Sequence, residues 1–348
     1  MKLHRAAPQR ATLMEAEAGE AACAVTRMLA INRPAFAAIG ERLRAAPPAV
    51  VVTCARGSSD HAATYAKYLI ETMTGTPTAS AALSVASVYD APAAAPGLRL
   101  CLAISQSGQS PDLIAMVEAQ RAAGAFVVAI VNAENSPLAA IADVVVALSA
   151  GKERSVAATK SYIASLAAIA AIVVAWTQDA RLSDALGDLP GRLAAAFELD
   201  WSAAVSAFEG ATSLFVLGRG YGLGIAQEAA LKFKETCALH AESFSAAEVR
   251  HGPMAIIGRN FHILALGGTD RAGMSVRDAA EDFRARGATV LLADPDDAAS
   301  DLPAIAGHPA IEPILMIQSF YRMASALALG RGCDPDSPPH LNKVTETL

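Results

Sequence analysis

Short, continuous runs of apolar residues recur along the chain, and each ends in a loop of small or polar residues. The runs cover 49–54, 100–104, 127–131, 214–217, 263–266 and 289–292. A helical pattern follows each run, and a run that is apolar throughout is typical of a strand buried on both faces of a parallel sheet. The pattern therefore predicts an α/β protein built from doubly wound parallel sheets.

The first three runs and the last three follow the same order, which indicates an internal duplication. Arg56 and Arg219, just after the first run of each set, are 163 positions apart. Such a period is too long for a solenoid and predicts two tandem flavodoxin-like domains. The predicted segments are a helical N-terminal segment at 1–45, a first domain at 46–180, a second domain at 200–333 and an extended tail at 334–348. The polar, proline-containing stretch 178–192 is predicted to lie in the linker.

Composition and charge exclude several classes of protein. Hydrophobic residues make up 53% of the chain and aromatic residues 5%, so the core is predicted to consist of aliphatic side chains. The net charge of −6 argues against nucleic-acid binding, which needs a basic face. The five cysteines are scattered without a C-x-x-C pair, which predicts reduced thiols, a cytoplasmic protein and no metal site. The N-terminus lacks a secretory signal, and the longest apolar run, 166–176, is too short to span a bilayer, so no membrane association is expected.

Three ionisable residues, Glu228, Lys232 and Glu235, stand at offsets of four and seven, which places them on one stripe of a predicted helix. The residues between them are mostly apolar, and a carboxylate in apolar surroundings can have its pKa raised towards neutrality, which suits proton transfer. His251 follows in the segment His-Gly-Pro. On spacing alone, a solvated ion pair between Glu228 and Lys232 is the more ordinary interpretation.

The segment Ser105-Gln-Ser-Gly-Gln-Ser110 comes directly after a predicted strand and before a helix that begins near Pro111. Backbone N–H groups at a helix N-terminus, three hydroxyls and an amide can together bind a phosphate dianion. Ser58 and Ser59, after the neighbouring strand, are predicted to close the other side of this cradle. The alternative is that the serines only cap the helix.

Five segments, spread over almost the whole chain, together resemble the sugar isomerase (SIS) family. They are Ser105-Gln-Ser-Gly-Gln-Ser110, Ser155-Val-Ala-Ala-Thr-Lys160, Glu228-Ala-Ala-Leu-Lys-Phe-Lys-Glu235, His251-Gly-Pro253 and Leu341-Asn-Lys-Val344. The likeness is to the isomerase half of glucosamine-6-phosphate synthase and, most closely, to the deaminases with two SIS domains. The resemblance implies two SIS domains, of which the first binds phosphate and the second carries the catalytic helix and histidine, with the tail over the active site.

The resemblance also implies roles for single residues. The phosphate-binding positions are Ser58, Ser59, Ser105, Gln106, Ser107 and Ser110. Glu235 matches the base that moves a proton between C1 and C2, and His251 matches the ring-opening histidine, which the family supplies from the neighbouring subunit of a homodimer. Lys343 matches the tail lysine that reaches the substrate carbonyl.

Supporting positions follow in the same way. Glu228 and Lys232 match residues that support the sugar hydroxyls and the base, and Val156 and Ala157 match backbone positions near the sugar. Arg56 replaces the small residue that is usual before the first glycine of the family's loop, and it is a candidate clamp for a substrate anion.

The function that the resemblance implies is the deamination of glucosamine 6-phosphate to fructose 6-phosphate and ammonia, without a metal or redox cofactor. The chain is expected to lack the amide-hydrolysing domain of the synthase. The alternatives are another phosphosugar aldose–ketose isomerase, a galactosamine-6-phosphate deaminase and a fructosamine-6-phosphate deglycase. A non-catalytic sugar-phosphate sensor would have lost the base or gained a basic module, and this chain keeps Glu235.

Overall fold

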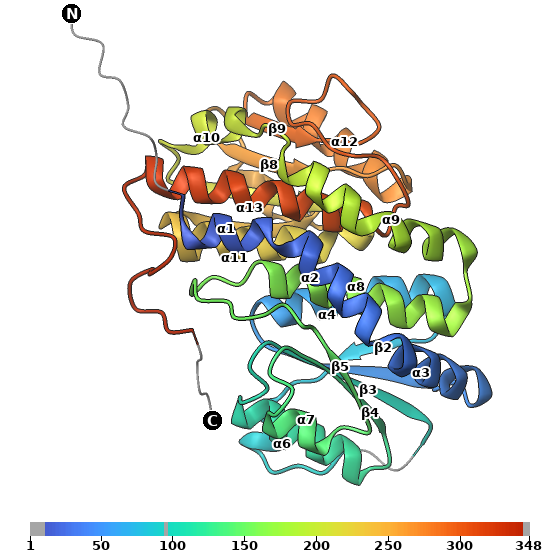
Figure 1. Cartoon of the computed structure of the whole chain (residues 1–348). Helices are drawn as coiled ribbons and strands as arrows, with labels where there is room; N and C mark the ends of the chain where they lie inside the picture. Colours follow the sequence, from blue (N-terminus) through green and yellow to red (C-terminus); the bar gives the residue numbers. More distant parts are fainter. Residues whose placement is uncertain (1–10, 94–96, 344–348) are drawn as a thin grey trace, which may run out of the picture.

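The computed structural model describes residues 11–93 and 97–343, and its strands form two parallel sheets with helices packed against them (Figure 1). The first sheet has the order β2-β1-β3-β4-β5 and the second has the order β7-β6-β8-β9. The first order is that of flavodoxin, and the second repeats it without a fifth strand. A single parallel bridge between Ala293 and Leu302 stands beside the last strand instead. The predicted fold class is therefore confirmed.

The first sheet consists of β1 (Val50–Cys54), β2 (Thr78–Ser80), β3 (Arg99–Ser105), β4 (Phe126–Val131) and β5 (Val144–Ala147). Helices α4 (Ser58–Thr74), α5 (Ser84–Ser87), α6 (Pro111–Ala122) and α7 (Pro137–Ile141) connect these strands. The second sheet consists of β6 (Ser213–Gly218), β7 (His240–Ser245), β8 (His262–Leu266) and β9 (Thr289–Ala293). Its helices are α10 (Ser202–Phe208), α11 (Leu223–Cys237), α12 (Arg271–Ala285) and α13 (Glu312–Gly330), with short 3-10 turns at Gly220–Gly222, Glu248–His251 and Pro253–Ile256.

The remaining helices are α1 (Leu13–Gly19), α2 (Ala21–Ile31), α3 (Arg33–Ala45), α8 (Lys160–Thr177) and α9 (Ala180–Phe197). The N-terminal segment is thus helical from residue 13 to 45, while residues 1–10 of that prediction lie outside the described residues. The tail, predicted to be extended, has no helix or strand from 334 to 343 and contains several turns, and 344–348 lie outside the described residues.

All six apolar runs form strands, but the sequence pattern did not predict β2, β5 and β7. These three strands lie at the edges of their sheets. An edge strand is short or partly exposed, so it does not need a continuous apolar run. In β7, for example, His240 and Glu242 are exposed and Ala241 is buried.

The stretch 178–192, predicted to lie in the linker, falls between the last strand of the first sheet and the first strand of the second, and most of it belongs to α9. Asp179 caps the helix by accepting a hydrogen bond from the backbone N–H of Leu182. Leucines at helical spacing, Leu182, Leu186, Leu189 and Leu193, are buried. The polar residues between them had hidden an amphipathic helix.

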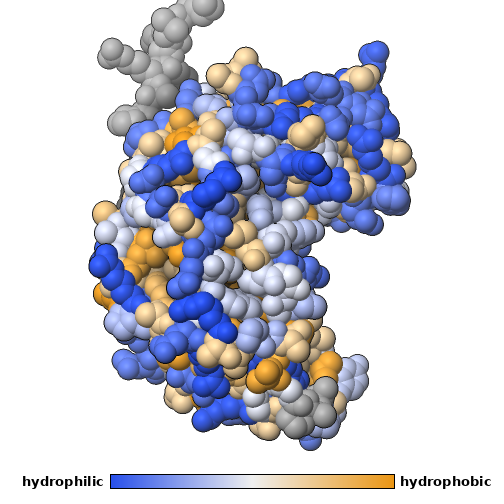
Figure 2. All heavy atoms as spheres, turned by 90° about the vertical axis from the view of Figure 1, so that its right-hand side faces the viewer, coloured by the Kyte–Doolittle hydropathy of each residue, from blue (hydrophilic) through white to orange (hydrophobic). Residues whose placement is uncertain are grey.

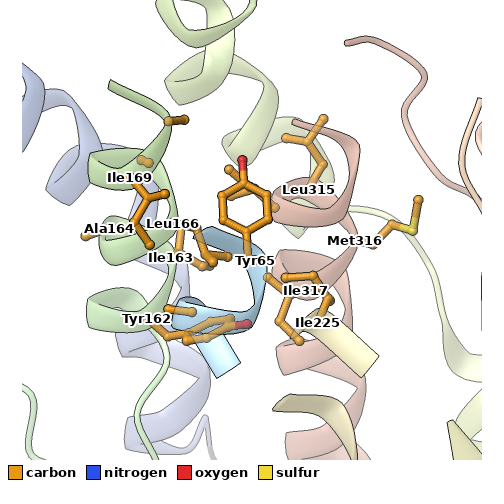
Figure 3. Packing of buried hydrophobic residues seen from close by; sticks show 14 of the residues in the cluster. Tyr65, Tyr162, Ile163, Ala164, Leu166, Ile169, Ile225, Leu315, Met316 and Ile317 are labelled. Atoms are coloured by element: carbon orange, nitrogen blue, oxygen red, sulfur yellow. The ribbon is translucent and has the colours of Figure 1, made fainter. Parts of the chain in front are cut away.

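The core lies between the two sheets, where helices from both halves meet. Helix α8 has the length and apolar composition of a membrane span, but 83% of it is buried inside the protein, so it is the core helix that its apolar run predicted. Tyr65 of α4 lies between α8 and α13, beside Ile163, Leu315 and Ile317 (Figure 3). Its hydroxyl donates to the carbonyl oxygen of Ala310 at 2.8 Å, so the buried phenol is satisfied.

Close packing of α4 against α11 joins the two halves at the site. A Cβ atom on Gly224 would lie 2.5 Å from the carbonyl oxygen of His61 and 3.0 Å from the backbone nitrogen of Tyr65. Glycine therefore lets the two helix backbones approach, and Glu228, one turn further along α11, is brought against α4. On the face shown in Figure 2, the surface is hollowed between the upper and lower parts of the molecule.

Candidate active site

A cavity of about 270 Å³ opens at the carboxyl ends of β1 and β3. These strands are neighbours in the sheet, but the connection from β1 leads to β2 on one side and the connection from β3 leads to β4 on the other. Ligands bind at such a switch point in doubly wound folds. The loops after the two strands line the cavity together with α11 and the tail. The cavity residues from the predicted site are Arg56, Ser58, Ser59, Ser105, Gln106, Ser107, Ser110, Val156, Lys232, Glu235 and Lys343.

The loop after β3 has the form of an anion cradle. Gly108 has a φ of +62°, and a Cβ atom there would lie 2.2 Å from the Oγ of Ser136, so only glycine fits this turn. The backbone N–H of Gly108 donates to the Oγ of Ser105 at 2.9 Å, which holds the loop closed. Ser110 occupies the N-cap position of α6 without a capping hydrogen bond from its side chain. Its hydroxyl and the positive end of α6 are therefore directed to the site rather than used within the helix.

Arg56 lines the cavity but is already paired. Its Nε and Nη2 donate to the Oδ2 of Asp112 at 2.9 and 2.6 Å, and Asp112 is buried in the first turn of α6. About half of the Arg56 side chain, 54%, is exposed. The pair fixes the guanidinium at the rim of the cavity, and its charge is largely balanced before any ligand arrives.

The charged stripe of α11 faces α4 and the cavity instead of bulk water. The Nζ of Lys232 lies 2.5 Å from the Oε2 of Glu235 and 3.3 Å from the Oε1 of Glu228. Glu228 and Lys232 are fully buried, whereas the Glu235 side chain is 21% exposed. The interpretation of the stripe as a solvated ion pair is therefore wrong.

The buried charges stabilise one another. Burial alone would raise the pKa of Glu228, but Lys232 and the hydrogen bonds from His61 and Ser58 outweigh it, so the pKa is lowered. Burial alone would lower the pKa of Lys232, but the charges of Glu228 and Glu235 outweigh it, so the pKa is raised. Lys232 is thus held as an ammonium and Glu228 as a carboxylate.

Ser58 bridges the two halves instead of standing in a loop. It is the first residue of α4, and its Oγ donates to the Oε1 of Glu228 at 3.1 Å. The same oxygen accepts a hydrogen bond from the Nζ of Lys232 at 3.2 Å. Its hydroxyl hydrogen is therefore engaged within the protein, and the N–H groups of Ser59 and Asp60 in the same turn donate to the carbonyl oxygen of Arg56.

The tail crosses the cavity and is tied to it. The Nζ of Lys343 donates to the Oε2 of Glu153 at 3.1 Å and to the carbonyl oxygen of Ser155 at 2.7 Å. The backbone N–H of Val156 donates to the carbonyl oxygen of Asp336 in the tail at 3.3 Å. Ala157 is buried, and its neighbours Val156 and Ala158 line the cavity. Val344, the last residue of the tail motif, lies outside the described residues.

His251 lies outside the lining of the cavity that contains Glu235. It ends the 3-10 turn Glu248–His251, it is exposed, and it is not among the described residues that line the cavity. Gly252, which follows it, has a φ of +144°, a conformation that turns the chain sharply and favours glycine.

The equivalent crevice of the second sheet is closed by the protein itself. Its cavity measures about 20 Å³, room for about one water molecule. The buried carboxylate of Glu312 accepts from the backbone N–H and the hydroxyl of Thr269 at 3.0 and 2.8 Å, and from the N–H of Gly307 at 2.8 Å. Burial raises the pKa of Glu312, and these hydrogen bonds oppose the shift. Of the two crevices, the first is therefore the one with room for a ligand.

Sequence reasoning missed four residues around the site: His61, Asp112, Glu153 and Tyr321. His61 stands three positions after Ser58, so helical spacing could have placed both on one face of α4. The hydroxyl of Tyr321, on α13, donates to the Oε1 of Glu228 at 3.2 Å. No local sequence pattern predicts such a long-range contact. Among the described residues, no group of three or more His, Cys, Asp or Glu side chains is arranged to hold a metal ion.

The chain is similar to proteins of known family. A glutamine–fructose-6-phosphate aminotransferase (isomerizing) of Aeropyrum pernix is 32% identical over 309 residues, which cover 83% of this chain and 49% of that protein. The chain thus spans about half the length of the curated relatives it matches. A crystal structure from Silicibacter pomeroyi, provisionally described as a phosphosugar isomerase, is 43% identical with a TM-score of 0.89, over 94% of this chain and 100% of that chain.

A glucosamine-6-phosphate deaminase of Thermotoga maritima is a more distant match, 19% identical with a TM-score of 0.69, over 93% of this chain and 100% of that chain, and it shares the fold. The family model of the SIS domain matches residues 49–175 and 207–298, one stretch for each sheet. These stretches make up more than half of the chain, and the chain belongs to the SIS domain family, as its motifs predicted.

Proposed function

We propose that the protein binds a phosphorylated sugar in the cavity and transfers a proton between C1 and C2 of that sugar. The observation that carries the proposal is that Glu235, held by the buried ammonium of Lys232, opens onto the same cavity as the anion cradle. A phosphate on the cradle and a carboxylate across the cavity are what a 1,2-proton transfer on a sugar phosphate requires. The membership in the SIS family and the names of the relatives support the same class of substrate.

Within this class, we propose the deamination of glucosamine 6-phosphate. After ring opening, Glu235 takes the proton from C2 of the aminoaldose, the electron pair forms the C1=C2 double bond, and O1 takes up a proton from water, which gives an enolamine. Glu235 then returns the proton to C1, which leaves an imine at C2. Water adds to this imine, and ammonia leaves as fructose 6-phosphate forms. One carboxylate serves both proton transfers, and the electron shift stays inside the sugar.

The state of Lys343 favours an amino sugar as the substrate. An amine that donates to the Glu153 carboxylate and to the carbonyl of Ser155 is engaged and is poorly placed to attack a sugar carbonyl. A reaction that starts from an aminoaldose needs no such attack, because the nitrogen is already on C2. Lys343 then serves as a hydrogen-bond donor that orients O1.

We also propose a homodimer in which His251 acts in the active site of the neighbouring subunit. Its exposure and its position outside the lining of the cavity support this arrangement. The nearby side chain of Ile256 is 64% exposed, which suits a contact surface beside the histidine. The five free cysteines support a cytoplasmic location.

The test is ammonia release from glucosamine 6-phosphate, with galactosamine 6-phosphate, fructosamine 6-phosphate and glucose 6-phosphate in parallel. We expect release from glucosamine 6-phosphate, and a loss of at least about a thousandfold in Glu235→Gln with substrate binding retained. Lys234→Met is the control, since Lys234 is exposed on the same helix and outside the cavity lining. Isomerisation of glucose 6-phosphate without ammonia release from any amino sugar would replace the deaminase by an aldose–ketose isomerase. Binding without any turnover would favour a sensor.

A further inference from the structure

A histidine outside the cavity contacts the charged stripe from the opposite half of the molecule. The Nδ1 of His61, on α4, lies 3.0 Å from the Oε2 of Glu228. The other oxygen of Glu228, Oε1, takes the contacts from Ser58, Tyr321 and Lys232. Among the described residues that contact Glu228, His61 is therefore the one that serves Oε2. Because a carboxylate oxygen accepts, the Nδ1 of His61 must carry the hydrogen.

The contact between His61 and Glu228 affects Glu235 because Lys232 has a limited number of N–H donors. The ammonium of Lys232 has three N–H groups, and its three contacts are the oxygens of Ser58, Glu228 and Glu235. Without His61, the Oε2 of Glu228 would be buried without a donor, which is costly for a charged group. Lys232 could serve that oxygen only by moving its ammonium from Oε1 towards Oε2, and such a movement would change the geometry of its contacts with Ser58 and Glu235.

We propose that His61 is a positioning residue for the reaction: by holding Glu228, it leaves Lys232 free to orient Glu235 and to stabilise its charge. This inference rests on the proposed function, in which Glu235 is the base. His61 does not act on the substrate itself, because it lies behind Glu228 and is not among the described residues that line the cavity. Its effect on the base passes through two ion pairs.

Other titratable groups surround His61 and Glu228. The titratable groups that face His61 and Glu228 from their own and neighbouring helices are Asp60, Tyr162, Tyr321, Lys232 and Glu235. Burial raises the pKa of Tyr162 and Tyr321, and the charge of Glu228 raises it further, so both phenols stay neutral near pH 7. With the carboxylates ionised, one ammonium thus faces two carboxylates of the stripe, and a donor from α4 relieves this imbalance.

Two substitutions of His61 separate the proposal from a merely structural role. Asparagine places its amide nitrogen at the δ position, where Nδ1 stands, so His61→Asn keeps a donor for Glu228. His61→Ala removes it. We expect His61→Asn to retain kcat within about threefold and His61→Ala to lose roughly tenfold or more, with KM changed by less than about threefold in both. His262→Asn is the control, because the ring of His262 packs against Phe208 and His262 is not among the described residues that line the cavity.

The pH profile supplies a readout that a loss of stability alone would not move. In His61→Ala, the acid limb of kcat/KM is expected to shift to higher pH, because a carboxylate with a weaker cationic donor keeps its proton to higher pH. The carboxyl ¹³C signal of Glu235, identified by its disappearance in Glu235→Gln, reports the same shift without turnover. An upward shift in His61→Ala, absent in His61→Asn and His262→Asn, supports the proposal.

Two results would overturn it. One is a His61→Ala profile and ¹³C titration that match those of the wild type. The other is equal loss in His61→Asn and His61→Ala, which would indicate that the ring's bulk matters and the donor does not. If no sugar phosphate is turned over by the wild type but the ¹³C signal behaves as expected, the proposed function fails while the positioning role stands.

Discussion

Replacing Lys232 by methionine is expected to destabilise the protein strongly, because the ammonium holds two carboxylates in place. Glu228 has no exposed surface, so water cannot take over from the lost cation. Removing one partner of a buried ion pair costs about 3–5 kcal/mol. Methionine keeps the length and the apolar stem of lysine, so little of this cost comes from lost packing.

The assay is urea unfolding at pH 7, followed by tryptophan fluorescence, since Trp176 and Trp201 are both buried in the core. Lys232→Met is expected to lower the free energy of unfolding by about 3–5 kcal/mol. Lys234→Met, an exposed lysine on the same helix, is expected to change it by less than about 0.5 kcal/mol. Adding Glu228→Gln to Lys232→Met should restore about 1 kcal/mol or more, because the unpaired buried charge is then gone. Equal stability of the two lysine variants, or a double variant no more stable than Lys232→Met, would refute this reasoning.

Three further changes follow from the same geometry. Gly224→Ala should separate α4 from α11 and lower both stability and kcat, whereas Gly258→Ala, whose added Cβ would meet nothing within 4 Å, should be neutral in both assays. Ser107→Ala and Ser110→Ala should each raise KM several-fold with kcat nearly unchanged, as expected for phosphate contacts made equally in the ground and transition states; a fall in kcat alone would contradict this role. The difference in unfolding free energy between wild type and Glu228→Gln should be full above about pH 5 and should shrink as the pH falls through the lowered pKa of Glu228. Measuring the unfolding free energy as a function of pH checks this. A difference that is constant down to about pH 3 would count against the lowered pKa.

The sequence was sufficient for the fold because its main signal is local. The six apolar runs and the loops that follow them predicted the central strands of both sheets, and the repeat predicted the duplication. The edge strands and α9 were missed, because half-exposed elements need no continuous apolar run. In these segments, contacts with the rest of the fold decide the structure.

The parts of the site whose residues lie close together in the sequence were predictable. The cradle at Ser105–Ser110 and the stripe that ends at Glu235 were found from local spacing, and the structure brings them to one cavity. The contacts of Glu228 with His61 and Tyr321 depend on how α4 and α13 pack against α11, which single-sequence patterns do not encode. The same holds for the closure of the second crevice by Glu312.

The central claim is that Glu235 carries a proton between C1 and C2, and isotopic labelling at C2 tests it most directly. Glucosamine 6-phosphate with deuterium at C2 would be incubated with the wild type and with Glu235→Gln, and the fructose 6-phosphate analysed by NMR. The account predicts a primary isotope effect in the wild type, part of the deuterium at C1 with the remainder exchanged into water, and no product from the variant. Product formation by Glu235→Gln at the wild-type rate, or ammonia release that leaves the deuterium on C2 of an aldose product, would contradict it.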